Sequence, residues 1–238
     1  MTDRIEFWAN ESGAVTVDWT VMTAGVVGLG LATISVVSSG VEDLSGDIDT
    51  QLSSGGWNMF SNGRVSLGSF DFSGGDATGW FGGAVMDMGG ELGELLVLGA
   101  GEATGYLVDV PEGASEAVMQ FDLVAGDSLD NSATWGTDTA TIMLNGEPVA
   151  IALASGNTVV FDIPQLDGTT VEATVRVEER ALGGNGGWTD SVAGVTITVD
   201  QPTEPIQFEM VSNANQGVGD EFWGLDNFEA STTGSPGF

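Results

Sequence analysis

Residues Val171 to Glu178 read Val-Glu-Ala-Thr-Val-Arg-Val-Glu, an unbroken alternation of apolar and polar side chains. Successive side chains of a β-strand point to opposite faces, so this pattern predicts a strand with one buried face. The same alternation recurs at 119–123 and at 195–199. The larger part of the chain is therefore predicted to be β-structure.

Turn signals separate these segments. Leu144-Asn145-Gly146-Glu147 places Asn-Gly between two β-like runs, which is the strongest short-range signal for a hairpin. Between residue 67 and residue 230 the sequence predicts roughly eight to ten short strands, a number typical of a sandwich or a barrel. No convincing helix is predicted after Leu52.

The amino-terminal part has a different texture. Ala14 to Val41 is an apolar run of 28 residues in which Asp18 is the only ionisable side chain, and an amphipathic stripe follows it. A helix of 28 residues would be about 42 Å long, enough to cross a hydrocarbon core of about 30 Å. We therefore predict a helix over residues 14–53.

The predicted fold class is α+β, a long N-terminal hydrophobic α-helix followed by an all-β sandwich domain. The boundaries divide the chain into five parts: a leader at 1–13, the helix at 14–53, a linker at 54–66, the sandwich at 67–230, and a flexible tail at 231–238.

Composition limits the possible functions. Thirty-five acidic residues oppose four basic ones, for a net charge of −31, so no basic patch for nucleic acid is expected. The chain has no cysteine and no histidine, which removes disulfides, Ser-His-Asp and Cys-His catalysis, and the usual zinc sites. Paired carboxylates, as in a glycosidase, are the remaining catalytic device, and we do not expect an enzyme.

The stretch Gly13-Ala14-Val15-Thr16-Val17-Asp18-Trp19 resembles the processing site of type IVb pilins of the Flp (tight-adherence) class. The resemblance implies that a prepilin peptidase cuts after Gly13, so that Ala14 begins the mature chain. Asp18 and Trp19 would then stand fifth and sixth, where the family usually has Glu and Tyr. In a filament, Asp18 would pair with the new amino terminus. An uncleaved signal anchor is the alternative.

A second resemblance covers residues 67–230. Gly68-Ser69-Phe70-Asp71-Phe72-Ser73-Gly74, with Gly79-Trp80 after it, and the late stretch Phe222-Trp223-Gly224-Leu225-Asp226-Asn227-Phe228 look like the ends of galactose-binding-like jelly-roll sandwiches. Such sandwiches occur in carbohydrate-binding modules and bacterial secreted proteins. The resemblance implies that the first and last strands pair, which would bring Asp71 and Asp226 together.

Calcium prefers hard oxygen ligands, and a divalent ion offsets the cost of a carboxylate in an apolar setting. We therefore predict a structural Ca2+ at Asp71 and Asp226, with Asp127 and Asp130 as a second cluster. The alternative is that these acids close turns or lie in solvent.

Tryptophans in Gly-rich polar loops are the candidates for contacts with sugars. Trp135 and Trp188 lie in such loops, although core packing is the alternative for both. Trp80 and Trp223 are predicted to lie in the core.

These features predict a subunit of an extracellular bacterial filament, a major or minor pilin-like protein. It would be inserted in the inner membrane as a precursor, cut by prepilin peptidase, and assembled with copies of itself by the pilus machinery. Its sandwich would mediate adhesion to surfaces or glycans. The alternative is a membrane-anchored carbohydrate-binding module that forms no filament.

Overall fold

The computed structural model describes residues 19–29, 64–132, 134, 136–155, 158–184 and 187–233. The chain divides into two compact units between Ser53 and Ser54. Each unit is described by itself.

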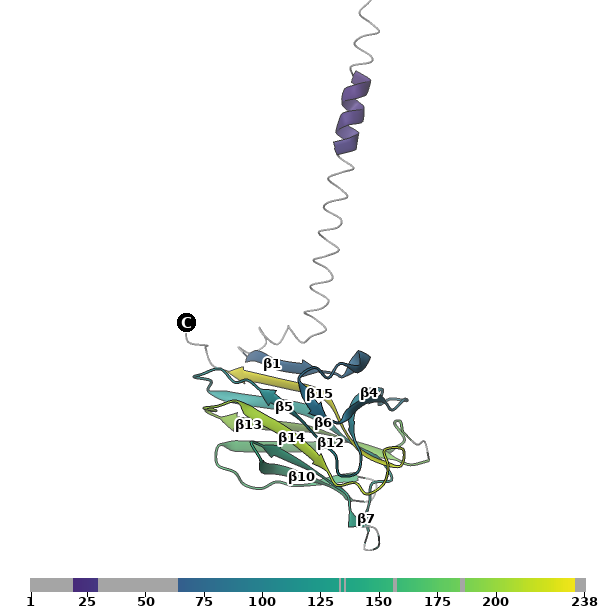
Figure 1. Cartoon of the computed structure of the whole chain (residues 1–238), viewed down its shortest axis with the longest axis vertical. Helices are drawn as coiled ribbons and strands as arrows, with labels where there is room; N and C mark the ends of the chain where they lie inside the picture. The colour runs from purple at the N-terminus through teal and green to yellow at the C-terminus, as the bar shows by residue number, and fades with distance from the viewer. Residues whose placement is uncertain are drawn as a thin grey trace, which may run out of the picture. The chain divides into compact units, whose positions relative to one another are not determined.

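The described part of the first unit is one helix over residues 19–29, drawn in purple in Figure 1. Eleven residues span about 16 Å, roughly half the thickness of a hydrocarbon core. No helix within the described ranges is long and apolar enough to span a bilayer. The predicted helix over 14–53, and with it the α+β fold class, is therefore wrong. The prediction took the length of the helix from the length of the apolar run, and hydrophobicity by itself does not set where a helix begins and ends.

The second unit is a β-sandwich (Figure 1). One sheet has seven strands, of which six follow one another as neighbours and β1 pairs with β15. In spatial order the six are β12 (Thr169–Arg180), β13 (Asp190–Asp200), β6 (Glu116–Asp127), β15 (Glu221–Thr233), β4 (Glu94–Leu98) and β3 (Ala84–Asp87), and β1 is Arg64–Phe70.

The other sheet has six strands. In spatial order they are β11 (Thr158–Asp162), β10 (Glu147–Ser155), β9 (Thr139–Leu144), β14 (Ile206–Ser212), β5 (Ala103–Val108) and β2 (Trp80–Gly82). The remaining elements are a small pair, β7 (Asn131–Ser132) with β8 (Gly136–Thr137), and a 3-10 turn, η3 (Ser73–Gly75).

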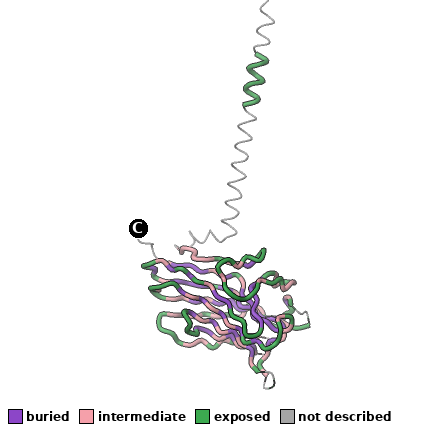
Figure 2. The backbone as a smooth tube through the Cα atoms, viewed as in Figure 1, coloured by how far each residue is buried: buried purple, intermediate pink, exposed green. Residues whose placement is uncertain are grey.

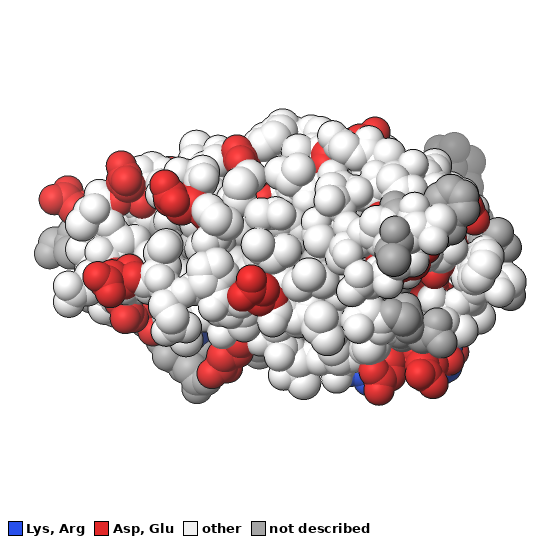
Figure 3. All heavy atoms as spheres, turned by 90° about the horizontal axis from the view of Figure 1, so that it is seen from below, with Lys and Arg blue, Asp and Glu red and all other residues white. Residues whose placement is uncertain are grey.

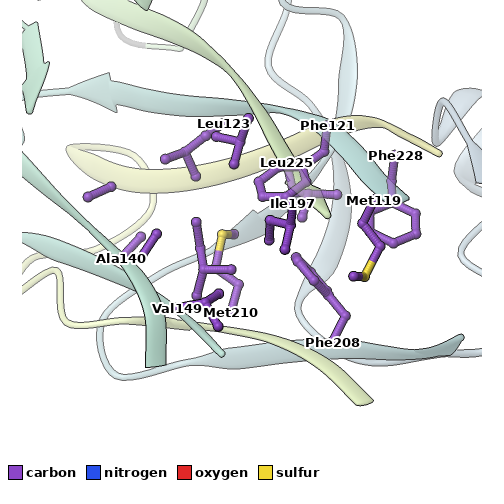
Figure 4. Close-up of a cluster of buried hydrophobic side chains, with 14 of the residues drawn as sticks. Met119, Phe121, Leu123, Ala140, Val149, Ile197, Phe208, Met210, Leu225 and Phe228 are labelled. Atoms are coloured by element: carbon purple, nitrogen blue, oxygen red, sulfur yellow. The ribbon is translucent and has the colours of Figure 1, made fainter. Parts of the chain in front are cut away.

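The core lies between the two sheets (Figure 2). In Figure 4, Phe121 and Leu225 of the seven-stranded sheet meet Phe208 and Met210 of the six-stranded sheet. Trp223 is fully buried in this cluster and the partly buried Trp80 packs against it, so the prediction that both lie in the core is confirmed.

The local predictions of β-structure are confirmed. The three alternating segments lie in β12, β6 and β13, which are consecutive neighbours in one sheet. Leu144 pairs with Glu147 across the β9–β10 hairpin, where Asn145 and Gly146 have φ angles of 50° and 83°. Positive φ at both central residues is what a type I′ turn requires.

The first and last strands pair, as the jelly-roll resemblance implied. β1 runs antiparallel to β15, with Arg64 opposite Thr233 and Phe70 opposite Phe228. Three residues of the predicted linker and three of the predicted tail are therefore in strands. A bulge interrupts the pairing of β15 with β6 between Asp226 and Glu229.

Candidate functional site

The ring of Phe81 lies on the outer face of the six-stranded sheet. Trp80 points into the core, where its ring stacks on Tyr106 at 5.4 Å and meets Phe228 edge-on at 5.0 Å. Adjacent side chains of a strand point to opposite faces. Phe81 therefore points outward, and 47% of its surface is exposed.

A glycine beneath this ring lets it lie close to the sheet. Phe81 is opposite Gly105 in the register of β2 and β5. A Cβ atom on Gly105 would be 2.6 Å from Cε1 and 2.7 Å from Cζ of Phe81, closer than real Cβ atoms approach. The ring therefore covers Gly105, and its other face is open to solvent.

Polar groups stand beside the ring. Gly105 pairs with Glu209 of β14, and Leu107 pairs with Gln207. Phe81 and Glu209 flank Gly105 from the two strands on either side of β5, and neighbouring strands are about 4.8 Å apart. We call Phe81, Leu107, Gln207 and Glu209 the Phe81 face. It offers an aromatic plane on β2 and a carboxylate and an amide on β14, with Leu107 of β5 between them.

The sequence held a signal for Phe81 that the prediction did not use. Two aromatic residues stand next to each other at Trp80-Phe81, and a strand cannot bury both on one face. Since Trp80 was predicted to lie in the core, the alternation already directs Phe81 to the opposite side.

A cavity of about 310 Å³ lies at an end of the sandwich, where several loops meet. Its walls come from β3 and the residue after it, the end of β6, the β12–β13 connection and the β14–β15 connection. The lining residues are Met86, Asp87, Met88, Asp127, Gly184, Val218 and Gly219.

Asp190 holds the walls of this cavity together. It is fully buried, and its Oδ1 accepts a hydrogen bond from the N–H of Asp127 at 2.9 Å. Its Oδ2 accepts from the N–H groups of Leu182 at 2.6 Å and Gly183 at 3.2 Å. One carboxylate thus ties the end of β6 to the loop before β13.

The residues predicted to bind calcium lie in two places, with Asp71 and Asp226 in one and Asp127 and Asp130 in the other. Asp226 lies opposite Asp122 in the register of β15 and β6, and Asp71 follows β1 directly. The pKa of Asp226 is raised to about 6. Burial is the main cause, the charges of Asp122 and Asp71 add to it, and the hydrogen bond from the N–H of Asn227 opposes it. The predicted proximity of Asp71 and Asp226 is thus present in the fold.

Hydrogen-bond donors of the protein already contact these carboxylates. Asp71 Oδ1 accepts hydrogen bonds from the N–H and the hydroxyl of Ser73. Asp122 pairs with Arg176 and also accepts from the amide of Asn227. Within the described ranges, no group of three or more acidic, histidine or cysteine side chains is arranged to hold a metal ion.

Asp127 and Asp130, the predicted second cluster, have different surroundings. Asp127 is 6% exposed and lines the cavity. The N–H of Asp130 donates to Oδ2 of Asp138, which is almost completely buried. Burial raises the pKa of Asp138. The hydrogen bond from the N–H of Asp130 lowers this pKa in part, and the negative charge of Glu221 raises it further. This second group holds loops in place.

Trp188 is 49% exposed in the β12–β13 connection. Trp135 lies outside the described residues, and so do Gly13, Ala14 and Asp18. Trp19 is the first residue of the described helix and is 72% exposed. The proposed processing and assembly roles of these residues stay predictions.

Acidic groups dominate the charged surface seen in Figure 3. The three described arginines are engaged in ion pairs: Arg64 with Glu116, Arg176 with Asp122, and Arg180 with Glu91.

Neither a protein-family model nor a curated protein matches this chain. Among solved structures, the chain is similar to the K3 cleaved adhesin domain of Lys-gingipain from Porphyromonas gingivalis, with 9% identity and a TM-score of 0.43 over 72% of this chain and 100% of that one.

Two further similar structures are carbohydrate-binding modules. The xylan-binding CBM22-1 domain of Paenibacillus barcinonensis Xyn10C has 10% identity and a TM-score of 0.36, covering 72% of this chain and 96% of that one. The module CBM6cm-2 of Cellvibrio mixtus lichenase 5A, solved with cellotriose, has 14% identity and a TM-score of 0.30, covering 72% and 100%. These likenesses are distant, and the β-sandwich itself rests on the strand pairing described above.

Proposed function

We propose that this protein is a β-sandwich binding module that recognises glycans at the cell surface or outside the cell. The observation that carries the proposal is the Phe81 ring, half-exposed over Gly105, with Glu209 on the far side of Gly105 in the same sheet. The C–H groups of a sugar ring pack against the electron-rich face of an aromatic ring. Its hydroxyl groups would donate to the carboxylate of Glu209 and to the amide oxygen of Gln207.

The test measures binding of the full-length protein to a panel of neutral oligosaccharides by calorimetry. Cellotriose and xylan fragments, named for two of the similar structures, are practical first probes. Phe81→Ala should weaken binding by about twofold to tenfold, because stacking on one ring contributes on the order of 0.5–1.5 kcal/mol. Phe81→Trp should preserve binding.

Val160→Ala is the matched control. Val160 is 48% exposed and lies on β11, at the opposite edge of the same sheet. The Val160→Ala variant should bind glycans as tightly as the unaltered protein does. Equal binding by the Phe81→Ala and Val160→Ala variants would refute the Phe81 face as the site, and a panel without any bound glycan would refute the function.

Calcium forms a second part of the proposal. A divalent cation between Asp71 and Asp226 would offset the burial and, to a lesser extent, the neighbouring negative charges that raise the pKa of Asp226. Asp122 is already paired with Arg176 and Asn227, so backbone oxygens or water would complete the coordination by Asp71 and Asp226. Assembly into filaments is not part of the proposal, because it depended on the long helix over 14–53.

A further inference from the structure

The lining of the cavity is negatively charged, which favours a cationic ligand over a neutral sugar. Two of its seven lining residues are carboxylates, Asp87 and Asp127, and none is basic. The described arginines are engaged with Glu116, Asp122 and Glu91, none of which lines the cavity. The cavity therefore presents a negative potential to whatever enters it.

The two carboxylates differ in exposure. Asp87 is exposed, and its Oδ1 accepts a hydrogen bond from the N–H of Gly89. Asp127 is 6% exposed and has a φ angle of 61°, held there by the hydrogen bond from its N–H to Asp190. A carboxylate with so little contact with water interacts more strongly with a cation than a surface one does.

The remaining walls are apolar and deformable. Met86, Met88 and Val218 supply thioether and aliphatic surface, and Met86 is 39% exposed. Methionine side chains adapt to irregular shapes. The lining has no aromatic ring, hydroxyl or amide side chain. A sugar would leave most of its hydroxyl groups without partners here, whereas a ligand with one cationic end would not.

We infer that this cavity binds a lysine or arginine side chain of a partner protein. The aliphatic stem would lie against Met86, Met88 and Val218, and the cationic group would meet Asp127 and Asp87. Long basic side chains bury their stems in this way while the charged end finds a partner. A volume of about 310 Å³ is at the lower end of the range for ligand pockets, which suits a single side chain.

Gly184 lies against the carboxylate of Asp127 in the lining of the cavity. A Cβ atom on Gly184 would be 2.6 Å from Oδ2 and 2.8 Å from Oδ1 of Asp127. Gly184→Ala would therefore place a methyl group against the carboxylate. Gly74 has a similar positive φ, 67° against 57°, with nothing within 4 Å of its Cβ position. Gly74→Ala thus reproduces the backbone strain without the obstruction.

The test uses the full chain labelled at the methionine methyl groups, with Met86 and Met88 assigned by substitution to leucine. The probe is the peptide acetyl-Gly-Arg-Gly-amide, and its control contains citrulline, which has nearly the same shape without the charge. The arginine peptide should shift the resonances of Met86 and Met88 saturably, and the citrulline peptide should not. Equal shifts with both peptides would overturn the inference.

Two pairs of variants separate a specific site from general attraction to an acidic protein. Asp127→Asn should weaken binding of the arginine peptide by about tenfold or more. Asp109→Asn, which removes the same charge from an exposed residue, should not. Gly184→Ala should weaken binding, and Gly74→Ala should leave it unchanged. Equal effects within either pair would overturn the inference, and the Gly184 pair decides the matter if the Asp127 variant fails to fold.

Discussion

Asp226 of β15 lies directly opposite Asp122 of β6, so that two carboxylates face each other across neighbouring strands. Only Asp122 has an arginine partner, Arg176. Together with burial and the charge of Asp71, this arrangement raises the pKa of Asp226 to about 6. The folded protein therefore holds a proton on Asp226 that the unfolded chain releases near pH 4.

The free energy of unfolding should fall as the pH rises from about 4 to about 6, because in that window the folded state binds more protons than the unfolded state. Asp226→Asn should remove this contribution and be more stable than the unaltered protein at pH 7. Its side-chain oxygen can still accept from the N–H of Asn227. Urea unfolding at several pH values measures the difference. The same pH dependence in both proteins would contradict the role given to Asp226.

Calcium should restore stability above about pH 6, where Asp226 is ionised in the folded protein. At pH 7, millimolar Ca2+ should raise the melting temperature of the unaltered protein relative to a chelator, since an ion that binds the folded state stabilises it by mass action. The increase should be smaller in Asp226→Asn and in Asp71→Asn. Asp109→Asn, at an exposed position, serves as the control. A melting temperature that does not depend on Ca2+ would exclude the site.

Asp190→Ala should destabilise the protein by about 3 kcal/mol or more. The substitution leaves three backbone N–H groups, those of Asp127, Leu182 and Gly183, without their acceptor in a buried place. Asp200→Ala removes an exposed acid and should change stability by less than about 0.5 kcal/mol. Denaturant unfolding of the two variants makes the comparison, and similar losses would show that Asp190 has no special role.

Gly126→Ala should destabilise the protein by about 1–3 kcal/mol through overpacking. A Cβ atom there would be 2.0 Å from Cζ of Phe222, which is fully buried with Leu95, Val97 and Val124. Phe222→Leu should cost less in the Gly126→Ala background than alone, and a double-mutant cycle measures this coupling. Additive losses would mean that the ring moves aside freely.

The strands were predictable where the signal is local. The alternation at 171–178 and the Asn145-Gly146 turn depend on geometry within a few residues, and both occur in the fold. The helix prediction failed because hydrophobicity is not a conformational preference. Low intrinsic propensity does not mark the ends of the helix either, because Gly25, Val26, Val27 and Gly28 all lie within the described helix.

The sites were only partly predictable. Asp71 and Asp226 could be brought together because they flank strands whose pairing the jelly-roll resemblance implied. Asp190 and Asp138 look in the sequence like any of the other acids, since their burial depends on which loops fold over them. The cavity beside Asp127 gathers residues from 86 to 219, and no local pattern in the sequence brings such distant segments to one place.

The pairing of β1 with β15 has a mechanical consequence. Arg64 and Thr233 are opposite each other at one end of the ladder, and Glu116 of β6 pairs with Thr233 and forms the ion pair with Arg64. Tension applied between Arg64 and Thr233 would load these bonds one at a time, as in unzipping, and not all together, as in shear. The row of Arg64, Thr233 and Glu116 would then rupture first, at low force, when the sandwich is stretched by its two ends.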